Sequence, residues 1–255
     1  MKIEIDKLYD IKMTSFGVLQ FVSRGVSVPE SKWRKKKGKS ILAYMMLNPK
    51  IKYNKDKIID MFFPDGKPDT VEDSFKQAIF NIRSTFKNPY LNFLILEGKM
   101  LYLNPDCYFK SDAEEFNKLC NIARSAEKSC EERRQACIDA VELYKGEFLE
   151  GNYEQWCEDI RSDFHNKFIS VSEHLLDILI QERRFDEIIY YSEKLLSQDK
   201  LNEKAYMSLI EAYVKSEKPK SARESYSKML KKYQEELGEV PDQKTRRKIE
   251  SFLAS

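Results

Sequence analysis

Histidine and cysteine are scarce in this 255-residue sequence, and their spacing fits no common metal site. There are two histidines and five cysteines, and no CxxC pair occurs. A zinc site needs four such ligands at short, regular spacings, so we expect no bound metal. An odd number of unpaired cysteines is typical of reduced thiols, and we expect at least four of the five to be packed in the interior.

The motifs of several enzyme classes are missing too. Neither HExxH nor GxSxG occurs, and no nucleophile can be paired with a base. Gly38-Lys39-Ser40 is similar to the end of a phosphate-binding P-loop, but Trp33 stands where that loop needs its first glycine. We therefore expect no enzymatic activity, no catalytic residue and no cofactor.

Long apolar runs are also missing. No stretch of about 18 apolar residues exists, which excludes a transmembrane helix. The N-terminus, MKIEIDKLYDIKM, lacks the apolar segment of a signal peptide. We expect a cytoplasmic protein with no membrane partner.

Charge is unevenly distributed along the chain. Residues 1–110 contain 20 Lys and Arg against 12 Asp and Glu, a net charge of +8. Residues 111–255 contain 24 against 30, a net charge of −6. A basic first part and an acidic second part indicate that only the first part meets a polyanion such as nucleic acid.

Short strands and three helices are predicted in the first part. Apolar and polar residues alternate in several segments of residues 2–28, which predicts a small antiparallel sheet. Helices are expected over residues 33–47, 56–63 and 69–87. Two apolar strands follow in residues 91–103 about Glu97-Gly98-Lys99, which predicts a hairpin with a charged tip.

The helix expected over residues 69–87 has an amphipathic pattern. Asp69 or Thr70 is expected to cap its start. Its outer face is polar, net basic and almost free of acids beyond the first turn. That face is typical of a solvated surface, and it is also what a helix in the DNA major groove requires. The inner face is an apolar stripe at helical spacing, formed by Val71, Phe75, Ala78, Ile79, Ile82 and Phe86.

Basic residues also gather at the start of the helix expected over residues 33–47. This end of the helix is consistent either with contacts to nucleic-acid phosphates or with a solvated, lysine-rich surface. The residues are Arg34, Lys35, Lys36, Lys37 and Lys39.

From Lys110 onward the pattern is almost wholly helical. Ser111 stands three residues before Glu114, which is the pattern of a capping box at the start of a helix. Further helices are expected over residues 131–144 and 153–184.

A repeat of 34 residues occupies the end of the chain. Residues 175–180 match residues 209–214, and Leu195-Leu196 matches Met229-Leu230. This period is that of tetratricopeptide (TPR) helix pairs. Such pairs stack into a concave surface that binds peptides or partner proteins.

The order of sheet, three helices and hairpin is that of a winged helix, and residues 33–86 resemble the OmpR-type effector domain of bacterial response regulators. The matching features are the basic run into a Leu/Tyr-rich helix, the short helix ending at Phe63-Pro64, and Ile82-Arg83 in the third helix. The resemblance implies that the third helix enters the DNA major groove and that the hairpin, the wing, touches the minor groove.

The same resemblance implies candidate DNA contacts. Phe80 and Asn81 stand where members of the family often carry arginines, so Phe80 either contacts thymine methyl groups or packs at an interface. The candidates are Ser74, Gln77, Asn81 and Arg83 facing the groove, Lys76 and Lys87 nearer phosphates, Lys99 at the wing tip, and Arg34, Lys35, Lys36 and Lys37 at the DNA backbone.

The second part resembles the bacterial transcriptional activator domain. In such a domain Trp156 is expected to be a core residue that braces the winged helix against the repeats. The resemblance is carried by Leu143-Tyr144-Lys145-Gly146-Glu147-Phe148-Leu149, by Trp156 and Arg161, and by Glu236-Leu237-Gly238-Glu239-Val240-Pro241.

An OmpR-type winged helix followed directly by this domain is the arrangement of regulators of the Streptomyces antibiotic regulatory protein type. The resemblance implies a mainly α fold with a small β part, with a DNA-binding domain over residues 1–108 and TPR-like repeats over residues 109–255. It implies a sequence-specific transcriptional regulator, an activator that binds promoter direct repeats as a homodimer at least and contacts RNA polymerase.

Double-stranded DNA and RNA polymerase are the partners that this resemblance implies. The TPR-like domain is open to a protein or small-molecule effector. The expected localisation of the protein is the bacterial cytoplasm, at the nucleoid. The alternative is a TPR adaptor protein whose winged helix serves protein–protein interaction.

Overall fold

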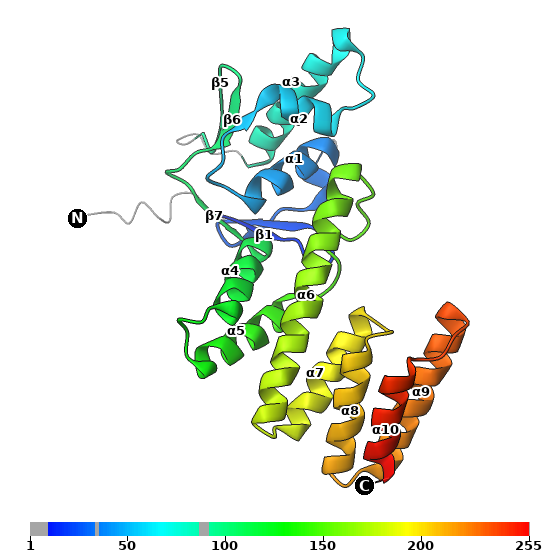
Figure 1. Cartoon of the computed structure of the whole chain (residues 1–255). Helices are drawn as coiled ribbons and strands as arrows, with labels where there is room; N and C mark the ends of the chain where they lie inside the picture. Colours follow the sequence, from blue (N-terminus) through cyan, green and yellow to red (C-terminus); the bar gives the residue numbers. More distant parts are fainter. Residues whose placement is uncertain (1–9, 34–35, 87–91, 255) are drawn as a thin grey trace, which may run out of the picture. The chain divides into compact units, whose positions relative to one another are not determined.

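The computed structural model describes residues 10–33, 36–86 and 92–254 (Figure 1). The chain is mainly helical and divides into two compact units. The first unit comprises the residues up to Lys118 together with Leu143–Asp163, and the second comprises Leu119–Glu142 together with Phe164–Ser255. The units therefore do not divide the chain at one point, and the domain boundary expected after residue 108 stays a prediction.

A four-stranded sheet in the order β3-β2-β1-β7 opens the first unit. β1 (Asp10–Thr14), β2 (Gln20–Ser23) and β3 (Val26–Ser27) are antiparallel neighbours, as the alternation of apolar residues predicts. β7 (Tyr108–Ser111) pairs with β1 in parallel, which adds a fourth strand that the sequence did not predict. The strand expected in residues 2–9 lies outside the described part of the chain.

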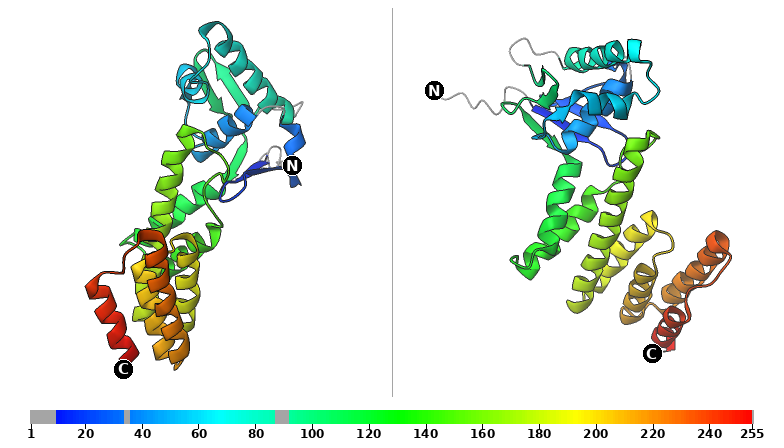
Figure 2. Two further views of the ribbon diagram at one scale, coloured as in Figure 1. Left: turned by 90° about the vertical axis from the view of Figure 1, so that its right-hand side faces the viewer. Right: turned by 45° about the horizontal axis from the view of Figure 1, so that its top comes forward.

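Three helices and a hairpin complete the winged helix. The helices are α1 (Lys36–Leu47), α2 (Lys55–Phe62) and α3 (Pro68–Thr85). The wing is formed by β5 (Leu94–Glu97) and β6 (Met100–Leu103), and β4 (Tyr53–Asn54) pairs with β6. The predicted order of sheet, three helices and hairpin is confirmed, and Figure 2 shows these elements from two further sides.

Close packing of α1 on α3 depends on Gly38. A Cβ atom at this position would lie 3.2 Å from the carbonyl oxygen of Ala78 and 3.3 Å from a side-chain carbon of Ile82. Glycine therefore lets the two helices approach each other. Gly38, Lys39 and Ser40 lie inside α1, so they do not form a phosphate-binding loop.

The start of α3 differs from the sequence-based expectation. The helix begins at Pro68, and its N-cap is Lys67, which makes no side-chain capping bond, rather than Asp69 or Thr70. Proline already has the φ angle of a helix, and it lacks the N–H that would be unpaired in the first turn. It therefore starts the helix without a side-chain cap.

Residues 143–163 pack on the winged helix within the first unit. Phe148 forms a β-bridge with Phe16 in the loop after β1. The N–H of Gly17 donates to the carbonyl oxygen of Glu147 at 2.8 Å. A segment of the second half of the sequence thus extends the core of the first.

Trp156 provides the aromatic part of this packing. It lies near the start of α6 (Gln155–Gln181) and contacts the rings of Tyr44 in α1 and Phe62 in α2, with centroid separations of 5.6 and 5.2 Å. Only 8% of its surface is exposed. Trp156 is therefore a core residue that packs against α1 and α2. This agrees with the part of the prediction that concerns its contact with the winged helix.

The second unit is a set of packed helices. Figures 1 and 2 show its last four helices as a row of neighbours. Besides the ends of α4 (Asp112–Arg124) and α6, it contains α5 (Cys130–Leu143), α7 (Phe185–Gln198), α8 (Glu203–Lys215), α9 (Pro219–Leu237) and α10 (Gln243–Ala254).

The 34-residue repeat is confirmed by the backbone at the turns between paired helices. Arg183 and Glu217 stand 34 residues apart, and both adopt the left-handed conformation, with φ angles of 57° and 56°. The backbone hydrogen bonds that close these turns repeat at the same offset, from Arg184 N–H to Leu179 O and from Lys218 N–H to Tyr213 O.

Helix ends in this part of the chain carry residues that commonly cap helices, and the capping box predicted at Ser111 is one of them. Ser111 caps α4, because its hydroxyl oxygen accepts the N–H of Glu114 at 3.0 Å. Gly238 ends α9 in the left-handed conformation that favours glycine. α10 begins at Gln243, after Asp242, whose carboxylate accepts the N–H of Thr245 at 2.8 Å.

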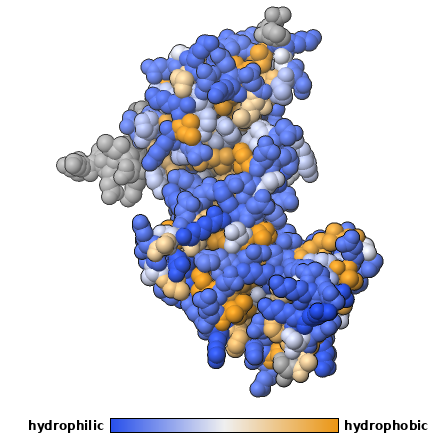
Figure 3. All heavy atoms as spheres, in the orientation of Figure 1, coloured by the Kyte–Doolittle hydropathy of each residue, from blue (hydrophilic) through white to orange (hydrophobic). Residues whose placement is uncertain are grey.

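The burial of the cysteines and the hydrophilic surface agree with what the composition predicts. Four cysteines are buried and Cys130 is exposed, as expected. The face drawn in Figure 3 is mainly hydrophilic. Within residues 10–33, 36–86 and 92–254, no helix is long and apolar enough to cross a membrane.

Candidate nucleic-acid interface

α3 has one buried face and one exposed face. The apolar stripe predicted from the sequence is confirmed: Phe75, Ala78, Ile79, Ile82 and Phe86 are buried and Val71 is half-buried. The exposed side chains along the outer face are Thr70, Asp73, Ser74, Lys76, Gln77 and Phe80, with Ser84 half-exposed.

Asn81 is not on the exposed face. It is 2% exposed, and its side-chain oxygen accepts a hydrogen bond from the amide of Gln77 at 3.1 Å. Asn81 sits at the edge of the buried stripe, beside Ala78 and Ile82. The structure therefore does not place Asn81 on the groove-facing side of α3, and its side chain contacts that side through Gln77.

Arg83 is directed to the wing. Its Nε and one Nη atom donate to the carbonyl oxygen of Leu94 in β5, at 3.1 and 2.9 Å. The guanidinium thus ties the end of α3 to the first strand of the hairpin. The structure corrects its expected place in the groove, because the strand provides a backbone acceptor.

Phe80 occupies the centre of the exposed face. It is 58% exposed, an unusual position for a phenylalanine. Asp73 and Lys76 form an exposed ion pair of 3.3 Å near the start of the same face. Beyond Asp73 the described part of the face carries no acidic residue, so its hydrogen-bond donors can approach a polyanion without a repelling charge.

The predicted backbone contacts fall into three groups. Arg34, Lys35 and Lys87 lie outside the described residues. Lys36 is exposed. Lys37 pairs with Glu154 at 2.5 Å, so its ammonium is held by the protein. The carboxylate comes from a distant part of the chain, and Lys37 stays a predicted DNA-backbone contact.

Lys99 is at the tip of the wing, as predicted. It follows Gly98, whose φ angle of 57° forms the hairpin turn, and 72% of its side chain is exposed. Its ammonium pairs with Asp56 of α2 at 2.9 Å. The hydrogen bond between them raises the pKa of Lys99 and lowers the pKa of Asp56.

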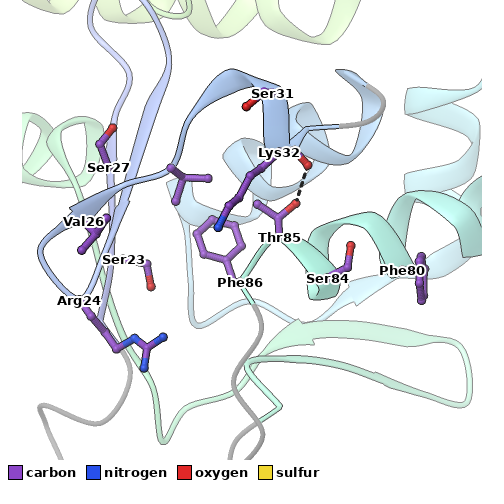
Figure 4. A pocket seen from close by; sticks show the side chains of 11 residues that line it. Ser23, Arg24, Val26, Ser27, Ser31, Lys32, Phe80, Ser84, Thr85 and Phe86 are labelled. Atoms are coloured by element: carbon purple, nitrogen blue, oxygen red, sulfur yellow. Dashed lines mark hydrogen bonds between the residues drawn. The ribbon is translucent and has the colours of Figure 1, made fainter.

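A cavity that the sequence did not reveal adjoins the C-terminal end of α3. Its volume is about 850 Å³, and Phe80 and Ser84 of α3 form one wall (Figure 4). Arg24 in the turn after β2 and Lys32 of the 3-10 helix η2 (Glu30–Lys32) contribute cations. No sequence signal joins these residues, because the fold alone brings the turn and η2 beside α3.

Comparison with known proteins identifies the second part of the chain. Residues 111–253, more than half of the sequence, match the family described as the bacterial transcriptional activator domain. The chain belongs to this family.

The fold is also similar to that of a solved structure. EmbR of Mycobacterium tuberculosis, solved in complex with a low-affinity phosphopeptide, is 19% identical, with a TM-score of 0.71. The match covers 96% of this chain and 65% of that chain. No curated protein matches the chain. A winged helix joined to a bacterial transcriptional activator domain is the arrangement of regulators of the Streptomyces antibiotic regulatory protein type, so the resemblance stated from the sequence is confirmed.

Arg161 holds the loop of residues 148–152, which packs on the winged helix. Its guanidinium donates to the carbonyl oxygens of Phe148, Leu149 and Asn152, at 3.1, 3.2 and 2.6 Å. Leu149 has a φ angle of 50°, a conformation that needs such support. The residues that carry the family resemblance therefore serve to hold this loop.

Glu154 connects the same region to α1. Its carboxylate accepts hydrogen bonds from Lys37 and from the indole N–H of Trp156, the latter at 2.8 Å. Burial raises the pKa of Glu154, but the bonds from Lys37 and Trp156 outweigh burial and lower it overall. Glu154 is thus held in its charged form beside the aromatic cluster.

Proposed function

We propose that this regulator binds DNA in a sequence-specific manner and activates transcription, with α3 in the major groove and the wing at the adjacent minor groove. The observation that carries the proposal is the exposed face of α3, which presents Lys76, Gln77, Phe80 and Ser84 and no acid beyond Asp73. A long exposed polar face on the third helix of a winged helix fits the dimensions of the major groove.

Each exposed residue has a role that follows from its chemistry. Gln77 is the amide available for hydrogen bonds to a base edge, and Asn81 orients it. Phe80 suits a thymine methyl group. Lys76 and Lys99 suit phosphates, which position the protein without reading sequence.

The family arrangement supports further partners. We infer that the regulator binds direct repeats as a homodimer and contacts RNA polymerase, in the bacterial cytoplasm at the nucleoid. For an effector, the second unit offers a cavity of about 400 Å³ between α6, α7 and α8. Arg183, Phe185 and Lys215 are among its lining residues.

Selection of bound genomic fragments with the purified full chain, followed by affinity measurements against salt concentration, tests the proposal. Gln77→Ala should weaken binding to the selected site by about 1–3 kcal/mol and leave binding to random DNA unchanged. Lys76→Ala should weaken both alike and reduce the salt slope by about 0.9. Gln234→Ala, an exposed glutamine of the second unit, is the matched control.

The exposed phenylalanine favours a second candidate function. Phe80 on a winged helix also suits a protein partner, as in a TPR adaptor. If wild type binds every duplex without dependence on salt, or binds none, DNA recognition is wrong and the adaptor function replaces it. Phe80→Ala then abolishes capture of a partner protein, whereas in the DNA-binding function it changes preference at a thymine position.

A further inference from the structure

The cavity beside α3 combines cations and hydroxyl groups. Arg24 and Lys32 face it from two elements, and Figure 4 shows both side chains extending toward the space between β2–β3 and the end of α3. Four serines lie around the same space: Ser23, Ser27, Ser31 and Ser84. Two cations and several hydroxyl donors are the groups that recognise a phosphate.

Among the described residues, no carboxylate neutralises the two cations. No ion pair joins Arg24 or Lys32 to an acidic residue of the described chain, and no acidic side chain is among the described residues that line the cavity. The nearest acid along the chain, Glu30, pairs with Lys39 instead. The cavity therefore carries a local positive charge that is available to a ligand.

Backbone geometry fixes the two segments that carry Arg24 and Lys32. Arg24 adopts a φ angle of 51° beside Gly25 at 77°, which forms the tight turn between β2 and β3. The hydroxyl of Thr85 donates to the carbonyl oxygen of Lys32 at 3.3 Å (Figure 4) and to that of Asn81 at 2.8 Å. This hydroxyl ties η2 to the last turn of α3.

The cavity also opens onto the face of α3 that is proposed to read DNA. Phe80 and Ser84 belong both to the exposed face of α3 and to the cavity wall. The major groove is about 12 Å wide, and phosphates line both of its edges. A duplex placed along Gln77 and Phe80 therefore carries its backbone past Ser84 toward Arg24 and Lys32.

We propose that this cavity is a phosphate site for the DNA backbone, in which Arg24 and Lys32 contact phosphates at one edge of the major groove occupied by α3. The inference rests on the proposed DNA-binding function and extends it to the N-terminal sheet. Phosphate contacts fix the register of a protein on the duplex and carry no sequence information. The turn after β2 and η2 thus set the position of α3 along the groove.

The test is the salt dependence of DNA binding by the full chain. Each phosphate contact contributes about 0.9 to the slope of log affinity against log salt. When salt rises from about 50 to 200 mM, the affinity of a variant that lacks two contacts should therefore fall about 12-fold less than that of the wild type. Arg24→Ala/Lys32→Ala should show this reduction on selected and random DNA alike. Lys228→Ala/Arg247→Ala removes two exposed cations of the second unit and should retain the wild-type slope.

The outcomes separate this inference from the function on which it rests. If wild type binds with a steep slope and the double variant keeps that slope, DNA recognition stands and the phosphate site is wrong. If wild type binds no duplex, both are wrong. Titration with inorganic phosphate in the absence of DNA distinguishes a small phosphorylated ligand. The assignment to the DNA backbone would be overturned if the double variant lost phosphate binding but kept the wild-type salt dependence of DNA binding.

Discussion

Replacement of Trp156 tests how the activator domain supports the winged helix. The indole contacts Tyr44 and Phe62, and its N–H donates to Glu154 at 2.8 Å. Two changes separate these interactions: Trp156→Phe retains a ring but loses the hydrogen bond, whereas Trp156→Ala loses both.

The expected magnitudes follow from burial and charge. A buried tryptophan replaced by alanine lowers the free energy of unfolding by about 3–5 kcal/mol. Loss of one hydrogen bond to a charged group accounts for about 2 kcal/mol of that change. Trp156→Phe should therefore destabilise the first unit by about 2 kcal/mol and Trp156→Ala by about 4 kcal/mol. Tyr153→Ala, three residues earlier and 87% exposed, should change stability by less than about 0.5 kcal/mol.

Fluorescence during urea unfolding measures this change in the first unit alone. The protein has two tryptophans, Trp33 and Trp156, and both belong to that unit. In the variants Trp33 is the remaining reporter. It is buried against Phe21 and Phe86, with centroid separations of 5.3 and 5.6 Å, so its emission changes when the unit unfolds.

A small effect would contradict the proposed role of this contact. If the free energies of unfolding of Trp156→Ala and Tyr153→Ala differ by less than about 1 kcal/mol, the aromatic cluster does not hold α6 to α1 and α2. A full effect in Trp156→Phe would assign the stabilisation to the Glu154 bond rather than to packing.

Two further predictions concern the same unit. Because the pKa of Glu154 is lowered in the folded protein, its charged form stabilises the fold above the unfolded value of 4.5. The stability difference between wild type and Glu154→Gln, measured by urea unfolding, should shrink as the pH falls below that value, and a constant difference would contradict the assignment. Gly38→Ala should destabilise by about 1–2 kcal/mol, because the close contact with Ala78 outweighs the higher helix propensity of alanine. Stabilisation of this variant in the same assay would show that α1 and α3 separate easily.

Periodicity predicted the helices of the winged helix and the apolar stripe of α3. In α3 the spacing of Phe75, Ile79 and Ile82 reports which side meets the core, since a helix buries residues three and four apart. The 34-residue match likewise reappears in the backbone at the turns of Arg183 and Glu217, because a repeated sequence adopts a repeated backbone. These signals are local and can be read without tertiary structure.

Tertiary contacts explain what the sequence left unresolved. Lys37 and Glu154 are 117 residues apart, so the basic run gave no sign that one of its members is paired. β7 completes the sheet by a parallel pairing with β1, which no turn signal marks. Asn81 lies at the border between the buried and exposed faces of α3, where periodicity gives the centre of the stripe but not its width.

The burial of Asn81 changes how specificity has to arise in the proposed complex. With Asn81 buried and Arg83 bonded to the wing, Gln77 is the one amide that α3 presents to a base edge among its described, exposed residues. One such contact provides about 1–3 kcal/mol of discrimination. Specific binding exceeds non-specific binding by about 4–10 kcal/mol in typical complexes. Two protomers on direct repeats double the contribution to about 2–6 kcal/mol, which reaches that range only when both half-sites are occupied. With one amide and the thymine contact proposed for Phe80 on each reading face, we expect dimeric binding to be needed for the full range of specificity.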